Sequence, residues 1–174
     1  GEENIVKGKK FFIAASHQSM FETFLLQTIF NSPVFILKKE LLLLPIFGWY
    51  LKKIGSISIK RNKISKENLG FYDDILKLAN TTNRPLIIFP QGTRLLPEER
   101  VPFKKGVSKI YEKLRVSCQP IAINSGFTWP KYGNKKIHTT LTVSILEPID
   151  PGQNKELFLK NLQHAIYAEL DTLD

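Results

Sequence analysis

The sequence has one cysteine and few histidines, which excludes two kinds of site. Cys118 is the only cysteine among 174 residues, so an internal disulfide framework and a cysteine-based metal site are excluded, and a reducing compartment is favoured. The three histidines, His17, His138 and His164, lack the spacing of zinc ligands. We therefore expect no metal ion, and we expect Cys118 to be a small core residue rather than a nucleophile.

A long apolar run is also missing. The most apolar stretch, Leu41 to Leu51, is shorter than the roughly 18 residues that a transmembrane helix needs, and Pro45 and Gly48 interrupt it. Basic and aromatic residues in and around it are typical of a segment that lies at a membrane interface: Lys38, Lys39, Trp49, Tyr50, Lys52 and Lys53. Burial of the leucines in the core and an interfacial patch remain alternatives.

Positive charge is the one clear deviation in composition. The chain holds 25 Lys+Arg against 16 Asp+Glu, a net charge of +9, whereas its 43% hydrophobic residues are ordinary for a globular protein. Its length predicts a single domain that spans residues 1–174. The excess indicates an anionic partner, and nucleic acid, an anionic lipid surface and a phosphorylated substrate all qualify. No motif of a nucleic-acid-binding family is present, so we expect no nucleic acid.

Strand-like and helix-like apolar patterns alternate along the chain. Strands are expected over Lys10–Ala15, Pro33–Leu37, Ser56–Ile59, Arg84–Phe89, Gln119–Ile123 and, as a long strand, Ile137–Leu146. Helices are expected over Ser19–Phe30, from Ser65 to about Asn80, over Gly106–Leu114 and over Glu156–Leu173. The alternation predicts a single α/β layered domain with a mostly parallel central sheet flanked by helices.

A histidine and a carboxylate follow the first expected strand. His17 lies in the turn after that strand, where α/β proteins place functional groups, and Glu22 lies five residues on, at the start of the next helix. In that placement the carboxylate would bond one ring nitrogen and leave the other basic. Ser19 and Glu22 also fit a capping box, which would account for the glutamate without catalysis. Both interpretations remain open.

The segment Phe89-Pro-Gln-Gly-Thr-Arg94 follows the most hydrophobic strand. Its proline and glycine predict a tight turn with exposed backbone N–H groups, which suits an anion. Arg61 and Lys38 also follow strands, and with Arg94 they could clamp a phosphate. The alternative is an ordinary strand-ending turn with solvated cations.

In order and spacing, four segments resemble the motifs of the 1-acylglycerol-3-phosphate acyltransferase family, which includes the bacterial lysophosphatidic acid acyltransferases. They are His17-x4-Glu22, Lys38-x-Glu40-Leu41 with the strand that ends near Arg61, Phe89 to Arg94, and Gln119 to Gly126. The resemblance covers about residues 10 to 150. It implies transfer of a fatty acyl group from acyl-CoA or acyl carrier protein to the sn-2 hydroxyl of lysophosphatidic acid, giving phosphatidic acid, without any cofactor or metal ion beyond the acyl donor.

The resemblance also implies roles for individual residues. His17 would be the general base and Glu22 would orient it, while the segment Ile121 to Gly126 would pack behind the site. The other residues would bind the phosphate or shape its loop: Lys38, Arg61, Gln91, Gly92, Thr93 and Arg94. Two positions depart from the family, which usually has Asp for Glu22 and Glu for Gln91. A carboxylate at position 91 is therefore not essential here, although an amide can still support the loop by hydrogen bonds.

The substrate implied by the resemblance resides in a bilayer. We therefore expect a membrane-associated protein at the cytoplasmic face of the bacterial inner membrane, with an anionic membrane surface and acyl carrier protein as candidate partners, and with an N-terminal helical anchor preceding Gly1. Acylation of glycerol-3-phosphate or of another lysophospholipid is an alternative activity. A non-catalytic phospholipid-binding module is the alternative from another class.

Overall fold

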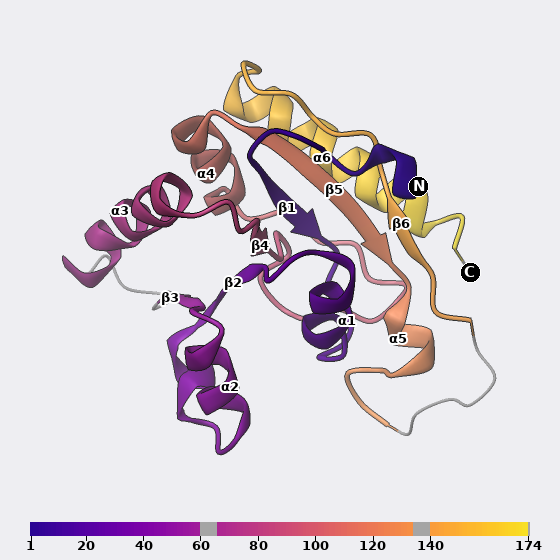
Figure 1. Cartoon of the computed structure of the whole chain (residues 1–174). Coiled ribbons are helices and arrows are strands. Elements are labelled where there is room, and N and C mark those ends of the chain that lie inside the picture. Colours follow the sequence, from indigo (N-terminus) through magenta and orange to yellow (C-terminus); the bar gives the residue numbers. More distant parts are fainter. Residues whose placement is uncertain (60–65, 134–139, 174) are drawn as a thin grey trace.

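The structure, a computed structural model, describes residues 1–59, 66–133 and 140–173. At its centre lies a six-stranded sheet with the order β3-β2-β4-β1-β5-β6 (Figure 1). The strands are β1 Phe11–Ala15, β2 Val34–Lys38, β3 Ile57–Ile59, β4 Leu86–Ile88, β5 Ser117–Ile123 and β6 Val143–Ile145. Strands β1 to β5 run parallel, and β6 pairs antiparallel with β5. The predicted mostly parallel sheet is confirmed.

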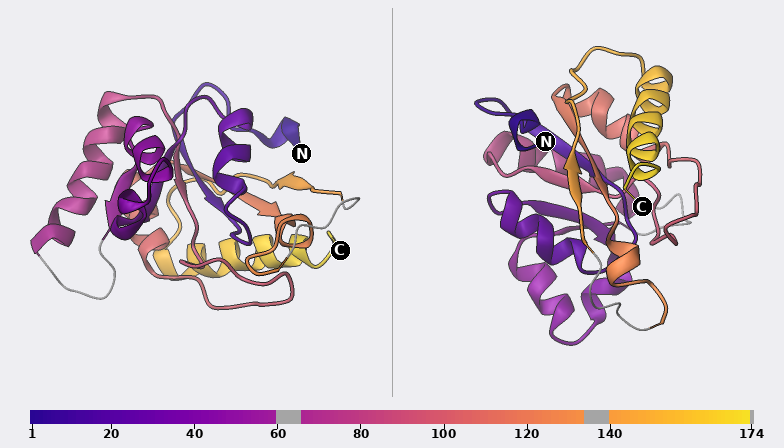
Figure 2. Two further views of the ribbon diagram at one scale, coloured as in Figure 1. Left: turned by 90° about the horizontal axis from the view of Figure 1, so that it is seen from below. Right: turned by 90° about the vertical axis from the view of Figure 1, so that its right-hand side faces the viewer.

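Helices cover both faces of this sheet (Figure 2). They are α1 Glu22–Ile29, α2 Phe47–Lys53, α3 Lys66–Thr81, α4 Gly106–Leu114, α5 Ser125–Thr128 and α6 Lys155–Leu170, with the 3₁₀ helices η1 Glu2–Asn4 and η2 Lys39–Leu43. Along β1 the side chains alternate between two cores. Phe12 and Ala14 join the core under α3, α4 and α6, whereas Ile13 and Ala15 join the core under α1 and α2.

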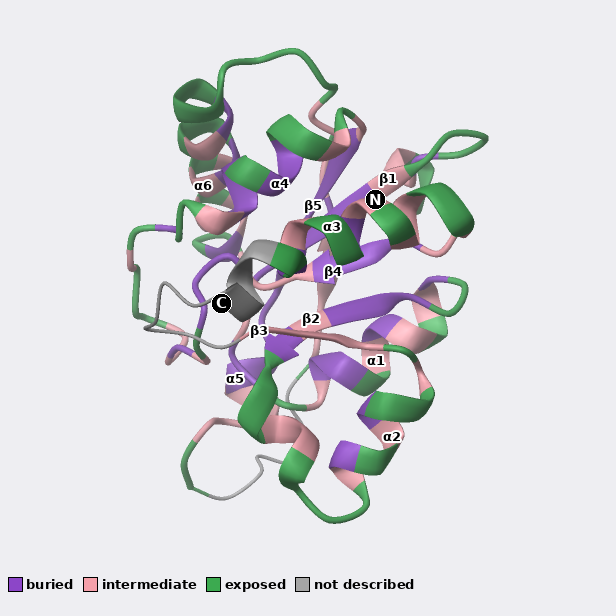
Figure 3. Cartoon of the chain, turned by 90° about the vertical axis from the view of Figure 1, so that its left-hand side faces the viewer, coloured by how far each residue is buried: buried purple, intermediate pink, exposed green. Residues whose placement is uncertain are grey.

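Coverage of both faces accounts for the almost entirely apolar central strands. Phe12 and Ile13 are fully buried in β1, and Figure 3 shows the same burial along the neighbouring strands. Because β1, β2, β4 and β5 are parallel, the chain leaves all four at the same edge of the sheet. Residues that follow these strands therefore come together in space, although they are far apart in the sequence.

The long strand expected over Ile137–Leu146 is wrong. Within the described part of that range, β6 covers only Val143–Ile145, and residues 137–139 lie outside the described residues. The partner strand β5 ends at Ile123, and the Asn124 side chain accepts the backbone N–H of Thr142 at 2.7 Å, which ends the ladder.

Two expected helix boundaries also differ. Helix α1 begins at Glu22 rather than Ser19, because residues 16–21 form the turn that carries His17. Helix α6 ends at Leu170 rather than Leu173, and it begins with Asn154 as N-cap, whose side chain accepts the backbone N–H of Leu157. The expected start of α3 at Ser65 lies outside the described residues.

Candidate active site

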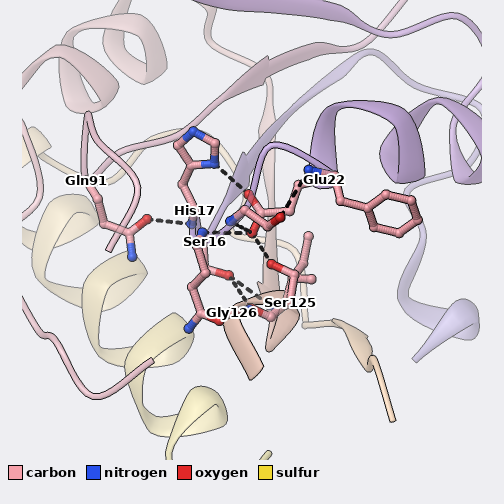
Figure 4. A network of polar contacts seen from close by, with 10 residues as sticks. Ser16, His17, Glu22, Gln91, Ser125 and Gly126 are labelled. Atoms are coloured by element: carbon pink, nitrogen blue, oxygen red, sulfur yellow. Dashed lines mark hydrogen bonds and ion pairs between the residues drawn. The ribbon is translucent and has the colours of Figure 1, made fainter. Parts of the chain in front are cut away.

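His17 and Glu22 form a hydrogen-bonded pair at the carboxyl end of β1. The Nδ1 atom of His17 lies 2.5 Å from Oε2 of Glu22 (Figure 4). Glu22 is fully buried, whereas 19% of the His17 side chain is exposed. An Nδ1–H that donates to the carboxylate leaves Nε2 as an acceptor, and Figure 4 shows this second nitrogen turned away from Glu22.

The second oxygen of Glu22 holds the turn around His17. Oε1 accepts the backbone N–H groups of Gln18 at 2.7 Å and of Ser19 at 3.0 Å. The Ser125 hydroxyl donates to the same oxygen. A buried carboxylate is costly unless it is hydrogen-bonded, and this one accepts bonds on both oxygens. Glu22 thus makes the capping-type contact and the histidine contact at the same time.

Ser125 is the first residue of α5, two residues after the end of β5, and it lies beside Glu22 in Figure 4. Next to it, the Gly126 N–H donates to Oε1 of Gln18 at 2.9 Å. A Cβ on Gly126 would come within 2.9 Å of both Gln18 and Pro97, so glycine allows the close approach. The bond from Ser125 to Glu22 was not predicted from the sequence. Its signal is the position of Ser125 two residues after a parallel strand that pairs with β1.

The loop after β4 is bonded to the backbone of His17. Gln91 is 1% exposed, and its Oε1 accepts the His17 N–H at 2.7 Å. The Leu95 N–H donates to the carbonyl of His17 at 2.9 Å. Gly92 has a φ of +76°, a conformation that other residues rarely adopt. Gln91 is thus placed to support the loop and the turn that carries His17.

Tyr167 of α6 bonds the backbone of the loop that follows β4. Burial raises the pKa of the Tyr167 hydroxyl, and hydrogen bonds with the Val101 backbone and the Gln91 side chain offset part of this rise. The Tyr167 hydroxyl donates to the Val101 carbonyl at 2.6 Å and accepts the Val101 N–H at 3.1 Å. Through these two bonds with Val101, helix α6 is connected to the loop that follows β4.

The ring of His17 stacks on Phe89, with centroids 4.0 Å apart and planes 16° apart. Phe89 in turn stacks near Phe35 of β2, at 6.3 Å. A ring held by a carboxylate at Nδ1 and by an aromatic face has little freedom to rotate. The sequence does not reveal this contact, because Phe89 fits equally well as the end of a buried strand.

A cavity of about 600 Å³ opens beside His17. Its polar lining includes four of the predicted residues and two lysines that were not predicted: Lys38, Gly92, Thr93, Arg94, Lys104 and Lys131. Its apolar walls come from β2, β3, β4 and four helices and include Phe35, Leu41, Phe47, Leu51, Phe71 and Ile110. Cations and a base beside apolar walls suit an amphiphile with an anionic head group.

The structure describes Lys104 but not Arg61, the remaining cation predicted to bind phosphate. Arg61 lies outside the described residues. Lys104 reaches the cavity because its backbone N–H donates to the carbonyl of Pro90 at 2.8 Å, a contact without a sequence motif.

In residues 1–59, 66–133 and 140–173, no group of three His, Cys, Asp or Glu residues could hold a metal ion. No helix in these ranges is long and apolar enough to cross a membrane.

Comparisons with known proteins agree with this geometry. A sequence model of the acyltransferase family matches residues 1–124. The chain is 36% identical to a Pseudomonas aeruginosa protein named 1-acyl-sn-glycerol-3-phosphate acyltransferase over 148 residues, which cover 83% of the chain and 56% of the relative. A Saccharomyces cerevisiae protein of the same name is 32% identical over 154 residues, covering 86% of the chain and 50% of the relative.

A Helicobacter pylori protein of that name is 37% identical over 160 residues, which cover 90% of the chain and 67% of the relative. The crystal structure of the 1-acyl-sn-glycerophosphate acyltransferase PlsC from Thermotoga maritima matches with a TM-score of 0.81 at 27% identity, covering 99% of the chain and 70% of that protein. The chain spans about half the length of the Pseudomonas and yeast relatives. The chain therefore belongs to the 1-acyl-sn-glycerol-3-phosphate acyltransferase family.

Proposed function

We propose that this chain transfers a fatty acyl group from an acyl thioester to the sn-2 hydroxyl of 1-acylglycerol-3-phosphate, giving phosphatidic acid. The observation that carries the proposal is the His17–Glu22 pair on the wall of a cavity that Lys38 and Arg94 also line. The names of the relatives support the choice of acceptor.

His17 acts as the general base in this reaction. Its Nε2 takes the proton of the sn-2 hydroxyl while the hydroxyl oxygen attacks the thioester carbonyl carbon. The carbon–sulfur bond of the tetrahedral intermediate then breaks, and the proton on Nε2 passes to the leaving thiolate. Glu22 keeps a proton on Nδ1, so that Nε2 is the basic nitrogen.

The cations of the cavity bind the phosphate of the acceptor. Arg94 follows β4 and Lys38 ends β2, so both lie at the sheet edge that carries His17. Lys104 lines the same cavity and is a further phosphate ligand. Arg61 follows β3 by two residues and is proposed for the same role on the resemblance alone. The apolar walls accept fatty acyl chains, and the reaction uses no cofactor or metal ion beyond the acyl donor.

The acceptor and the product are membrane lipids, so the protein works on a membrane surface. Its net charge of +9 favours anionic lipids. We place it at the cytoplasmic face of the bacterial inner membrane, where coenzyme A and acyl carrier protein are the candidate carriers of the acyl group.

The test is phosphatidic acid formation from lysophosphatidic acid and an acyl thioester on lipid vesicles. His17→Ala is expected to lower kcat by about 10²-fold or more, the loss expected for a general base. His164→Ala is the matched control, because His164 is exposed on α6. Full activity of His17→Ala would overturn the mechanism.

Two other outcomes would replace the proposed activity. An unaltered protein that binds phospholipid without turnover would instead be a lipid-binding module. Turnover of glycerol-3-phosphate, or of a different lysophospholipid, in preference to lysophosphatidic acid would change the acceptor.

A further inference from the structure

The segment that joins β2 to β3 exposes a cluster of large apolar side chains. Ile46 is 85% exposed, Leu43 82%, Trp49 65% and Leu44 47%. We call these four residues the apex. In Figure 1 the segment extends from β2 and β3 away from the rest of the sheet. Isolated exposed apolar residues are common, but four within seven positions form a patch of the kind that marks an interaction site.

The backbone of the apex is held in an unusual conformation. Ile46 has φ +61° and ψ −58°, and the Phe47 N–H donates to the Pro45 carbonyl at 2.5 Å to close a γ-turn. Residues branched at Cβ rarely adopt a positive φ. Gly48 allows α2 to lie close against η2, because a Cβ there would overlap the Leu42 carbonyl. The fold thus holds the most exposed of these apolar side chains on a strained turn.

Basic residues surround the apex. Lys39, Lys52 and Lys53 are exposed. The sequence from position 38 to position 53 contains a single acidic residue, Glu40. The Lys53 Nζ lies 5.0 Å from the centroid of the Trp49 ring. An apolar centre with an aromatic residue and a basic rim complements an anionic bilayer, whose acyl chains lie beneath a layer of phosphates.

The same segment forms part of the cavity wall beside His17. Leu41 of η2 and Phe47 and Leu51 of α2 line that cavity. Phe24 of α1 extends the apolar surface, since its ring lies 6.0 Å from Phe47 and it is 40% exposed. One side of the segment therefore meets the cavity, and the other side carries the apex.

We propose that the apex inserts into the boundary between head groups and acyl chains of an anionic bilayer, with Lys39, Lys52 and Lys53 on lipid phosphates. This docking holds the cavity wall formed by η2 and α2 at the membrane surface, where a lipid acceptor enters. The inference deepens the proposed function and rests on it for the identity of the lipid that enters. The docking surface itself is argued from exposure, charge and backbone conformation.

Trp49 reports directly on this contact. Trp49 and Trp129 are the two tryptophans of the chain, so Trp129→Phe leaves Trp49 as the single tryptophan fluorophore. With vesicles of phosphatidylcholine and phosphatidylglycerol, the emission of Trp49 is expected to shift to shorter wavelength, and brominated acyl chains are expected to quench it. Salt is expected to weaken binding because the lysines contribute electrostatic attraction. Unchanged emission and no quenching would overturn the proposal.

A matched set of variants separates the apex from general surface hydrophobicity. Leu44 and Leu157 are 47% and 46% exposed, on different parts of the chain. Leu44→Glu and Ile46→Glu are expected to lower vesicle affinity about tenfold or more, because each removes apolar contact and adds a repelled charge. Leu157→Glu is expected to bind as the parent does. Equal binding by all three variants would refute insertion of the apex.

Sedimentation velocity without vesicles tests whether the apex instead joins two copies of the chain. The parent is expected to sediment in the same way as Ile46→Glu. A dimer that Ile46→Glu dissociates, together with absent vesicle binding, would assign the apex to a second copy and overturn the proposal.

Turnover of a water-soluble, short-chain lysophosphatidate separates docking from chemistry. On this acceptor Ile46→Glu is expected to keep the parental rate, whereas on vesicles it is expected to lose rate. A parent that is inactive on both acceptors, but binds vesicles through the apex, would refute the proposed function and leave the docking surface intact.

Discussion

Glu22 contacts His17 with one carboxylate oxygen and the turn that carries His17 with the other. Oε2 lies 2.5 Å from Nδ1 of His17, while Oε1 accepts the backbone N–H groups of Gln18 and Ser19. The carboxylate therefore fixes both the ring and the backbone from which the ring extends. A group with two equivalent acceptor oxygens is needed for this arrangement.

Glu22→Gln is expected to lower kcat by about 10²-fold, with little change in KM. An amide has one acceptor oxygen, so it cannot serve both Nδ1 of His17 and the backbone N–H groups. Steady-state kinetics on vesicles measure both constants.

Glu22→Asp is the companion variant, because it keeps the charge and shortens the side chain. We expect a smaller loss of kcat than for Glu22→Gln. A Glu22→Gln protein with parental kcat would show that the carboxylate only caps the turn.

Ser125→Ala is expected to lower kcat about tenfold, because it removes a buried donor to Oε1 of Glu22. The expected spectroscopic change is a shift of the downfield proton resonance of His17 Nδ1–H, measured by NMR. A purely structural role would leave that resonance in place.

Ser108→Ala is the matched control for Ser125→Ala. Ser108 of α4 is also buried. Its hydroxyl donates to the Lys105 carbonyl at 2.9 Å and not to Glu22. If the two substitutions had equal effects on kcat and on the His17 resonance, Ser125 would have no specific role in positioning His17 and Glu22.

Much of the architecture could be predicted because it depends on local patterns. The fully apolar stretches of β1 and β4 indicate strands covered on both faces, and parallel strands bring their carboxyl ends to one edge. Placing His17 and Arg94 at that edge requires only that each follows a strand of a parallel sheet. The lysines at 38 and 104 illustrate the difference: Lys38 follows a recognisable strand, whereas Lys104 reaches the cavity through a bond to Pro90.

Contacts made by side chains across the fold could not be predicted. The bonds from Ser125 to Glu22 and from Gln91 to the His17 backbone join positions that are 103 and 74 residues apart. The length of β6 depended on where its partner β5 ends, which periodicity does not reveal. The choice between core and interface for Leu41 to Leu51 had no single answer, because Leu41 and Leu51 line the cavity while Leu43 is exposed.

Cys118 is expected to resist thiol reagents in the folded protein. It is fully buried in β5, and this burial raises the pKa of its thiol well above the usual value, although a hydrogen bond with the Ala14 backbone offsets part of the rise. Because the thiolate is the reactive form, a raised pKa and lack of access act in the same direction. Reaction with a chromogenic disulfide reagent near pH 8 measures this.

The control for Cys118 is the same reaction in guanidinium chloride, where one thiol per chain is expected to react at once. Rapid reaction under native conditions would show that β5 opens readily or that the thiol is accessible. Loss of activity on such modification would contradict its assignment to the core.

Gln91→Glu is expected to keep kcat within about threefold, because a carboxylate oxygen can still accept the His17 N–H. The stability of the protein is expected to fall by about 1 kcal/mol or more, since an ionised carboxylate would replace a neutral amide that is 1% exposed. Thermal unfolding and steady-state kinetics test the two halves of this prediction.

Gln91→Leu is the opposite control: it cannot accept the His17 N–H, and about tenfold or more of kcat is expected to be lost with it. If Gln91→Leu instead kept parental kcat, Glu22 and the Leu95 N–H would be sufficient to hold the turn that carries His17.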